Sequence, residues 1–187
     1  MIERIIIAGA GGQGIMLMGK IIALAGLKEN KQVSWIPSYG AEVRGGAAYC
    51  MVVISDKEIS SPFVNQADTL IVMNQPSWDK FKEKIGPGGV MIINSSLVER
   101  AKKKRNKLKI SAAPFTDIAS GLGNIKVANM VAVGLYLKTK KILSLQSALK
   151  VIEEAAPAGR TDLININQKA IYAGLGTIKK ERKDEQD

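Results

Sequence analysis

The first thirty residues contain an unbroken aliphatic run, a glycine-rich turn and a second apolar stretch. Residues 5–8 read Ile-Ile-Ile-Ala, and apolar side chains then recur at helical spacing at Ile15, Met18, Ile22 and Ala25. A continuous apolar run is typical of a parallel strand buried on both faces, and the later spacing is typical of a helix. The pattern therefore predicts a strand, a tight turn and a helix.

The same alternation continues along the chain. Apolar runs predict further strands over residues 32–36, 47–54, 69–73, 90–94 and 108–112, with a small edge strand near Ile59, and Pro37 is expected to end the second strand. Helical periodicity begins near residues 74, 124, 144 and 161. Alternating strands and helices predict one α/β domain over residues 1–180, with an open, mostly parallel, doubly wound (Rossmann-like) sheet and helices on both faces. Residues 181–187 form a charged tail that is expected to fray.

The glycine turn is the first candidate site. Gly9, Gly11 and Gly14 have the G-x-G-x-x-G spacing, which lets backbone N–H groups at a helix N-terminus approach a phosphate or another chain closely. Gly11, Gly12, Gln13 and Gly14 are therefore candidate cofactor-binding residues, and close packing of strand on helix is the alternative explanation for the glycines. A plain NAD site is disfavoured, because the second predicted strand ends without the acid that would bind the ribose.

The loop after the second strand is the other candidate site. Residues 38–46 contain three glycines together with Ser38, Tyr39, Glu42 and Arg44. The segment has too few apolar side chains to belong to the core, and binding groups often lie in such loops at strand ends. In a doubly wound sheet this loop and the glycine turn can face the same crevice. The alternative is an ordinary solvent loop with an internal Glu42–Arg44 pair.

Composition limits the chemistry available to the chain. One cysteine and no histidine exclude an internal disulfide, a cysteine-only zinc site, a protein-held iron–sulfur cluster and the familiar histidine-dependent triads. Cys50 lies inside an apolar run and is expected to be a buried structural thiol. We therefore expect neither catalytic nor metal-binding residues in this chain.

The formal charge of +10 is concentrated near residues 100–109, where seven basic residues stand. A solvated connector is favoured over a nucleic-acid site, because no aromatic or glycine pattern accompanies the charges. No stretch has the roughly 20 uninterrupted apolar residues of a membrane span, and Met1 leads directly into the first strand rather than into a signal peptide. A cytoplasmic protein is expected.

Four separated segments resemble the gamma subunit of 2-oxoacid:ferredoxin oxidoreductases. They are residues 8–14 (Ala-Gly-Ala-Gly-Gly-Gln-Gly), 37–46 (Pro-Ser-Tyr-Gly-Ala-Glu-Val-Arg-Gly-Gly), 54–55 with 61–62 (Ile-Ser and Ser-Pro), and 123–130 (Gly-Asn-Ile-Lys-Val-Ala-Asn-Met). They occur in the right order and extend over nearly the whole chain. The resemblance adds Asn129 to the candidate cofactor-binding residues.

The resemblance implies a role within a larger enzyme. Members of the family oxidatively decarboxylate a 2-oxoacid to an acyl-CoA and pass electrons to ferredoxin, with thiamine diphosphate, Mg and iron–sulfur clusters held by partner subunits. The expected partners are alpha and beta subunits and, where present, a delta subunit, and coenzyme A would bind at the interface beside the thiamine site. Arg44 would contact either CoA or a partner subunit. The alternatives are an independent nucleotide-binding Rossmann-type protein and, with less support, a nucleic-acid-binding module.

Overall fold

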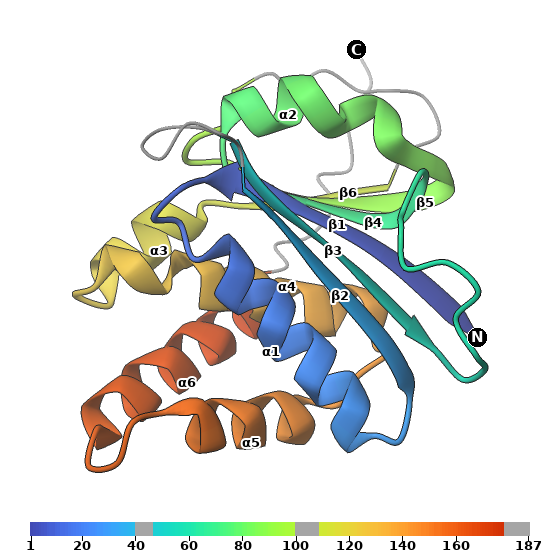
Figure 1. Cartoon of the computed structure of the whole chain (residues 1–187). Helices are drawn as coiled ribbons and strands as arrows, with labels where there is room; N and C mark the ends of the chain where they lie inside the picture. Colours follow the sequence, from blue (N-terminus) through green and yellow to red (C-terminus); the bar gives the residue numbers. More distant parts are fainter. Residues whose placement is uncertain (40–46, 100–108, 178–187) are drawn as a thin grey trace, which may run out of the picture.

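A single six-stranded sheet organises the chain (Figure 1). The structure is a computed structural model that describes residues 1–39, 47–99 and 109–177. The strand order is β2-β3-β1-β4-β5-β6, and β3 is antiparallel to both of its neighbours while β1, β4, β5 and β6 are parallel. The strands are β1 (Ile2–Ala10), β2 (Gln32–Tyr39), β3 (Ala47–Ser55), β4 (Ala67–Val72), β5 (Ile85–Asn94) and β6 (Lys109–Ala113). This confirms the predicted open, mostly parallel α/β sheet.

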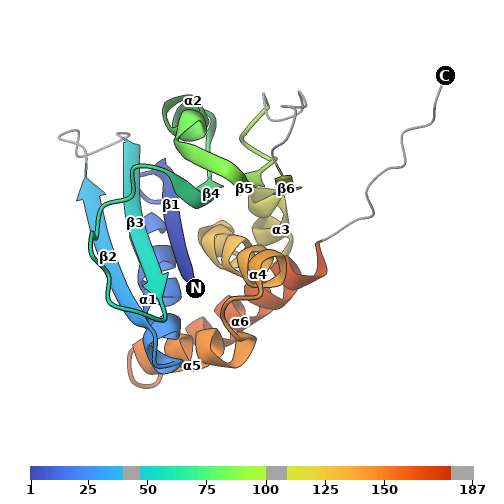
Figure 2. The same ribbon diagram turned by 90° about the vertical axis from the view of Figure 1, so that its right-hand side faces the viewer.

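Helices cover the two faces of the sheet unequally (Figure 2). On one side of the sheet lie α1 (Ile15–Lys28), α3 (Phe115–Gly121), α4 (Ala128–Lys140), α5 (Leu145–Ala155) and α6 (Thr161–Gly176), and on the other lies α2 (Gln75–Phe81). On the first side α1 and α4 contact the strands, and α5 and α6 pack on these two helices. The 3-10 helix η1 (Lys82–Lys84) follows α2, and the 3-10 helix η3 (Ile125–Val127) precedes α4. In the parts of the chain that the structure describes, no helix is long and apolar enough to cross a membrane.

The place of β1 in the middle of the sheet explains why residues 5–8 are all apolar. Ile5 and Ile7 belong to the core beneath the larger helical layer, whereas Ile6 and Ala8 belong to the core beneath α2. All four are fully buried, as expected for a central strand covered on both faces. Cys50 is likewise buried in β3, which confirms the prediction for its thiol, and burial raises the pKa of this thiol to about 12.

Three strand predictions were wrong. Pro37 does not end β2, which continues to Tyr39. Because β2 is an edge strand, it has a side without a partner strand, where a missing N–H costs no ladder hydrogen bond. The edge strand expected near Ile59 is absent from the described residues between β3 and β4, where Val64 instead packs into the core and its N–H lies 3.3 Å from Met51 Sδ. The strand predicted over residues 90–94 begins earlier, at Ile85, so that Gly86, Gly88 and Gly89 lie within β5, where Gly88 has a φ of 73°.

The order of the strands creates a crevice between β1 and β4. The chain leaves β1 through α1 toward β2 on one side of the sheet, and it leaves β4 through α2 toward β5 on the other side. The loops that follow β1 and β4 therefore diverge at the carboxyl ends of neighbouring strands. This is the position at which open α/β sheets bind ligands.

Candidate functional site

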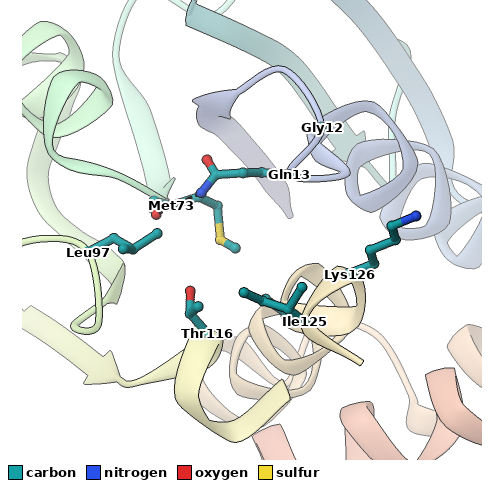
Figure 3. Close-up of a pocket in the computed structure, with 8 residues that line it drawn as sticks. Gly12, Gln13, Met73, Leu97, Thr116, Ile125 and Lys126 are labelled. Atoms are coloured by element: carbon teal, nitrogen blue, oxygen red, sulfur yellow. Dashed lines mark hydrogen bonds between the residues drawn. The ribbon is translucent and has the colours of Figure 1, made fainter. Parts of the chain in front are cut away.

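A small pocket occupies this crevice (Figure 3). Its volume is about 190 Å³, and it lies where the glycine turn, the ends of β4 and β5, α3 and η3 approach one another. We call it the switch-point pocket. It is lined by Gly12, Gln13, Met73, Leu97, Thr116, Ile125, Lys126 and Ala128.

Packing, one of the two explanations offered for the glycine turn, accounts for some of its glycines. Gly14 begins α1 in the left-handed region with a φ of 70°, and a Cβ there would overlap the side chain of Asn129. A Cβ at Gly9 would lie within 3.0 Å of Ile15, Gln13 and Met73. Gly11 and Gly12 are exposed and have open space where a Cβ would stand. Packing therefore accounts for Gly9 and Gly14, whereas Gly11 and Gly12 remain accessible to a ligand or partner.

The side chain of Gln13 forms hydrogen bonds that hold the glycine turn together. Its Oε1 accepts a hydrogen bond of 2.7 Å from the Ala10 N–H, and its Nε2 lies 3.5 Å from the Met73 carbonyl oxygen. The side chain thus connects the ends of β1 and β4 at the pocket. One turn N–H that could have bound an anion is consequently used internally.

Asn94 and Thr116 extend this polar support to β5 and α3. Asn94 is fully buried and its Nδ2 donates to the Met73 carbonyl oxygen at 3.1 Å and to Thr116 Oγ1 at 2.9 Å. Its Oδ1 accepts from the Thr116 N–H at 3.4 Å and from the Ser96 N–H at 3.3 Å. Because both ends of this amide are satisfied, Thr116 is held with its side chain at the pocket wall.

Asn129 supports the turn from outside the pocket. It is 2% exposed in the first turn of α4, and its Nδ2 donates to the Gly14 carbonyl oxygen at 3.3 Å. Asn129, a predicted cofactor-binding residue, is not among the residues that line the pocket, and its observed contact is with the glycine turn.

The second predicted loop is only partly described. Ser38 and Tyr39 end β2 opposite Tyr49 and Ala48 of β3, and Ala47 of β3 lies opposite Ala10 of β1. The backbone at these two residues therefore shares the end of the sheet with the glycine turn but lies two strands away from β1. Arg44 lies outside the described residues, as does its expected partner Glu42.

The pocket is largely apolar and has one charged lining residue. Met73, Leu97 and Ile125 form much of its wall, and Leu97 and Ile125 are 41% and 58% exposed. Lys126 is the single charged side chain among the described lining residues, and no carboxylate is included. This arrangement suits a narrow, mainly apolar group that carries negative charge near its exposed end.

Several pocket residues were not among the sequence-based candidates. Met73, Leu97 and Thr116 follow the carboxyl ends of β4, β5 and β6, and Ile125 and Lys126 precede α4. The position after each parallel strand was the available signal, but the side chains themselves are chemically ordinary. Among the described residues, no group of three or more His, Cys, Asp or Glu side chains could hold a metal ion.

Comparison with known proteins identifies relatives along almost the whole chain. The family model for pyruvate ferredoxin/flavodoxin oxidoreductase matches residues 4–177. The 2-oxoglutarate synthase subunit KorC of Methanocaldococcus jannaschii is 38% identical, covering 85% of this chain and 86% of KorC. The ketoisovalerate oxidoreductase subunit VorA of Methanothermobacter marburgensis is 33% identical over 95% of this chain, which spans only 37% of the length of VorA.

Solved structures share the fold. The gamma subunit of a keto/oxoacid ferredoxin oxidoreductase from Geobacter sulfurreducens superimposes with a TM-score of 0.79 at 31% identity, covering 93% of this chain and 96% of that subunit. The 2-oxoglutarate:ferredoxin oxidoreductase from Magnetococcus marinus, solved with 2-oxoglutarate, coenzyme A and succinyl-CoA bound, gives a TM-score of 0.86 at 22% identity. In that case 94% of this chain matches 30% of the longer chain, and the likeness supports the fold alone.

Proposed function

The chain belongs to the pyruvate ferredoxin/flavodoxin oxidoreductase family, and from this premise we propose that it is the gamma-type subunit of a 2-oxoacid:ferredoxin oxidoreductase. The overall reaction joins a 2-oxoacid and coenzyme A to give an acyl-CoA and CO₂, and two electrons pass singly to two oxidised ferredoxins. One proton is released from the thiol of coenzyme A. The observation that carries the proposal is the match of the family model to residues 4–177, together with a pocket at the carboxyl ends of β1 and β4.

The redox cofactors are assigned to the partner subunits. Thiamine diphosphate with Mg, bound in a partner, supplies the decarboxylation chemistry, and iron–sulfur clusters carry the electrons. This chain has one cysteine, which is buried, and no histidine, so it lacks the thiolates that a cluster needs. The proposed partners are the alpha and beta subunits, a delta subunit where present, and ferredoxin through the complex, in the cytoplasm.

The share of this chain is to position coenzyme A at the subunit interface. The switch-point pocket would accept the narrow pantetheine arm against Met73 and Ile125, and Lys126 would pair with a phosphate outside it. Gly11 and Gly12 offer exposed backbone at the same end of the sheet. Ser38, Tyr39 and Arg44 are proposed to complete the interface from the end of β2. By holding a flexible co-substrate, the subunit lowers the entropic cost of bringing its thiol to the acyl group.

The experiment is steady-state kinetics of the assembled complex with Lys126→Met in place of the parent chain. Removing one exposed positive charge near a phosphate should raise the KM for coenzyme A by about 2- to 10-fold, corresponding to about 0.4–1.4 kcal/mol, with little change in kcat. Lys169→Met is a matched control, because Lys169 is also exposed but lies on α6. Equal KM values for the two variants would contradict the placement of coenzyme A at this pocket.

An independent nucleotide-binding protein is the competing function. The spacing of Gly9, Gly11 and Gly14 supports this function. Against it, no carboxylate that could bind a ribose lines the pocket among the described residues, and the Ala10 N–H already donates to Gln13. Titration of the isolated chain with NADH or NADPH, followed by nucleotide fluorescence, separates the two functions. Saturable binding at micromolar concentration would favour the competitor.

A further inference from the structure

The outer face of α1 is unusually apolar for a helix surface. At 100° per residue, positions 17, 20, 24, 27 and 28 fall on one face about 100° wide. Leu17 is 45% exposed and Leu27 is 53% exposed, Leu24 is half-buried, and the remaining two residues are Lys20 and Lys28. Three of the five positions that face outward are therefore leucines. A helix that is apolar on all sides is normally buried on all sides.

A groove runs between this face and α5. It has a volume of about 510 Å³ and is lined by Lys20, Leu24, Leu27, Lys28, Val151, Glu154 and Ala155. Lys28 Nζ and Glu154 form an ion pair of 2.7 Å that joins the two helices across it. Leucine, valine and alanine side chains thus form most of the surface, and the charged groups stand beside them.

We propose that this α1–α5 groove docks an amphipathic helix of a catalytic subunit of the same oxidoreductase. The inference rests on the proposed function and adds the surface and the chemistry of its partner. The docking helix would place apolar side chains at i, i+3, i+4 and i+7 against Leu24 and Leu27, and an acidic side chain beside Lys20. Burying the exposed leucines would supply the main stabilisation.

Charge favours a different, acidic partner over a second copy of this chain. The chain has a formal charge of +10, so two copies would repel each other, and the groove of each copy would present the same lysines. Within the described residues Lys20 forms no ion pair, whereas Lys28 already pairs with Glu154. Lys20 is therefore the cation available to an incoming carboxylate.

Two further observations connect the groove with the rest of the enzyme. In VorA the matched segment is about a third of the chain, so the equivalent of this protein is joined there to further polypeptide. In this chain α1 begins directly after the glycine turn, and the turn lines the switch-point pocket. A partner helix held along α1 would therefore also fix the pocket relative to the catalytic subunit.

Thiol labelling of the assembled complex tests the proposal. Cys50 is buried, so Leu27→Cys introduces the one accessible thiol among the described residues. Co-assembly with the alpha and beta subunits should slow maleimide labelling of this thiol by about tenfold or more relative to the free chain. Lys169→Cys on α6 is the reference that corrects for a general change in reagent access. Labelling of Leu27→Cys at the same corrected rate in the complex and in the free chain would overturn the inference.

A second variant separates this inference from the proposed function. Leu24→Glu places a carboxylate in the groove and should weaken assembly by about tenfold or more, as measured by titration of the alpha and beta subunits. If the parent chain does not assemble with these subunits at all, the proposed function fails. If the parent assembles and Leu24→Glu assembles equally well, only the groove assignment fails. A parent chain that is a dimer in size-exclusion chromatography, and becomes a monomer with Leu24→Glu, would assign the groove to a second copy instead.

Discussion

At the scale of single residues, Gly14 has two separate reasons to lack a side chain. Its backbone is in the left-handed region, where a residue with a Cβ costs about 1–2 kcal/mol, and the added atom would also overlap Asn129. Gly14→Ala should therefore lower the free energy of unfolding of the isolated chain by about 2 kcal/mol or more in urea titrations.

Gly11 provides the control for Gly14 within the same turn. A Cβ at Gly11 meets nothing within 4 Å and its φ is not positive, so Gly11→Ala should change the free energy of unfolding by about 0.5 kcal/mol or less. If both variants lose the same free energy of unfolding, the left-handed backbone at Gly14 and its contact with Asn129 do not contribute to stability as proposed.

Glu3 introduces a pH dependence at the opposite end of the sheet. Burial raises the pKa of its carboxyl above the ordinary value, and this effect exceeds the opposing hydrogen bond from Thr69 and the ion pair of 3.1 Å with Lys140. The folded state therefore holds the proton more tightly than the unfolded state. Its contribution to stability is fully present below the unfolded pKa and is lost as the pH rises through the folded pKa.

Glu3→Gln removes this titration. Compared with the parent, the variant should gain stability as the pH rises from about 4 to about 7, which thermal melts at several pH values would measure. Glu154→Gln should show the opposite trend, because the hydrogen bond with Lys28 lowers the pKa of Glu154 and its contribution is lost as the pH falls. If the stability difference between Glu3→Gln and the parent does not change with pH, burial does not raise the pKa of the Glu3 carboxyl.

At the scale of elements, the crossing of α4 and α6 depends on two glycines that face each other. A Cβ at Gly134 would overlap the Ile171 carbonyl oxygen, and a Cβ at Gly174 would overlap that of Val131. Gly134→Ala and Gly174→Ala should each reduce the free energy of unfolding by about 1–3 kcal/mol, because backbone cannot yield as a side chain can. Gly176→Ala, in the last turn of α6 with open space around it, should be neutral or slightly stabilising. Denaturant titration of the three variants would detect this difference.

The sequence predicted most elements because their signals are local. Ser144 was expected to begin α5, and its Oγ indeed accepts from the Ser147 N–H at 3.1 Å. Helical periodicity was expected to begin near residue 124, and η3 over Ile125–Val127 indeed leads into α4 there. Predictions failed where neighbours decide the outcome, since the edge position of β2 makes Pro37 acceptable and no local pattern reveals which strand lies at an edge.

At the scale of the whole molecule, the candidate site was only partly visible in the sequence. Gly12, Gln13 and Gly14 were candidates because the glycine spacing stands between a predicted strand and a predicted helix. The structure places the first two in the pocket wall and the third at the helix start. Met73, Leu97 and Thr116 come from three separate strand ends, and only the assembled sheet brings them together. Ser38 and Tyr39 lie at the same end of the sheet as the glycine turn, but β3 separates their strand from β1. This separation follows from the order of the strands, which the sequence does not reveal.

The last prediction concerns what the chain can do without partners. With one buried cysteine and no histidine, the purified chain should show no iron–sulfur absorbance, and it should not reduce ferredoxin when given a 2-oxoacid, thiamine diphosphate, Mg²⁺ and coenzyme A. Adding the alpha and beta subunits should restore both signals, because they hold the redox groups and this chain contributes the site for the co-substrate. The measurement is anaerobic spectroscopy of ferredoxin reduction, with the alpha and beta subunits alone as the control. Turnover by the isolated chain would show that it contains a complete active site and would contradict its role as a positioning subunit.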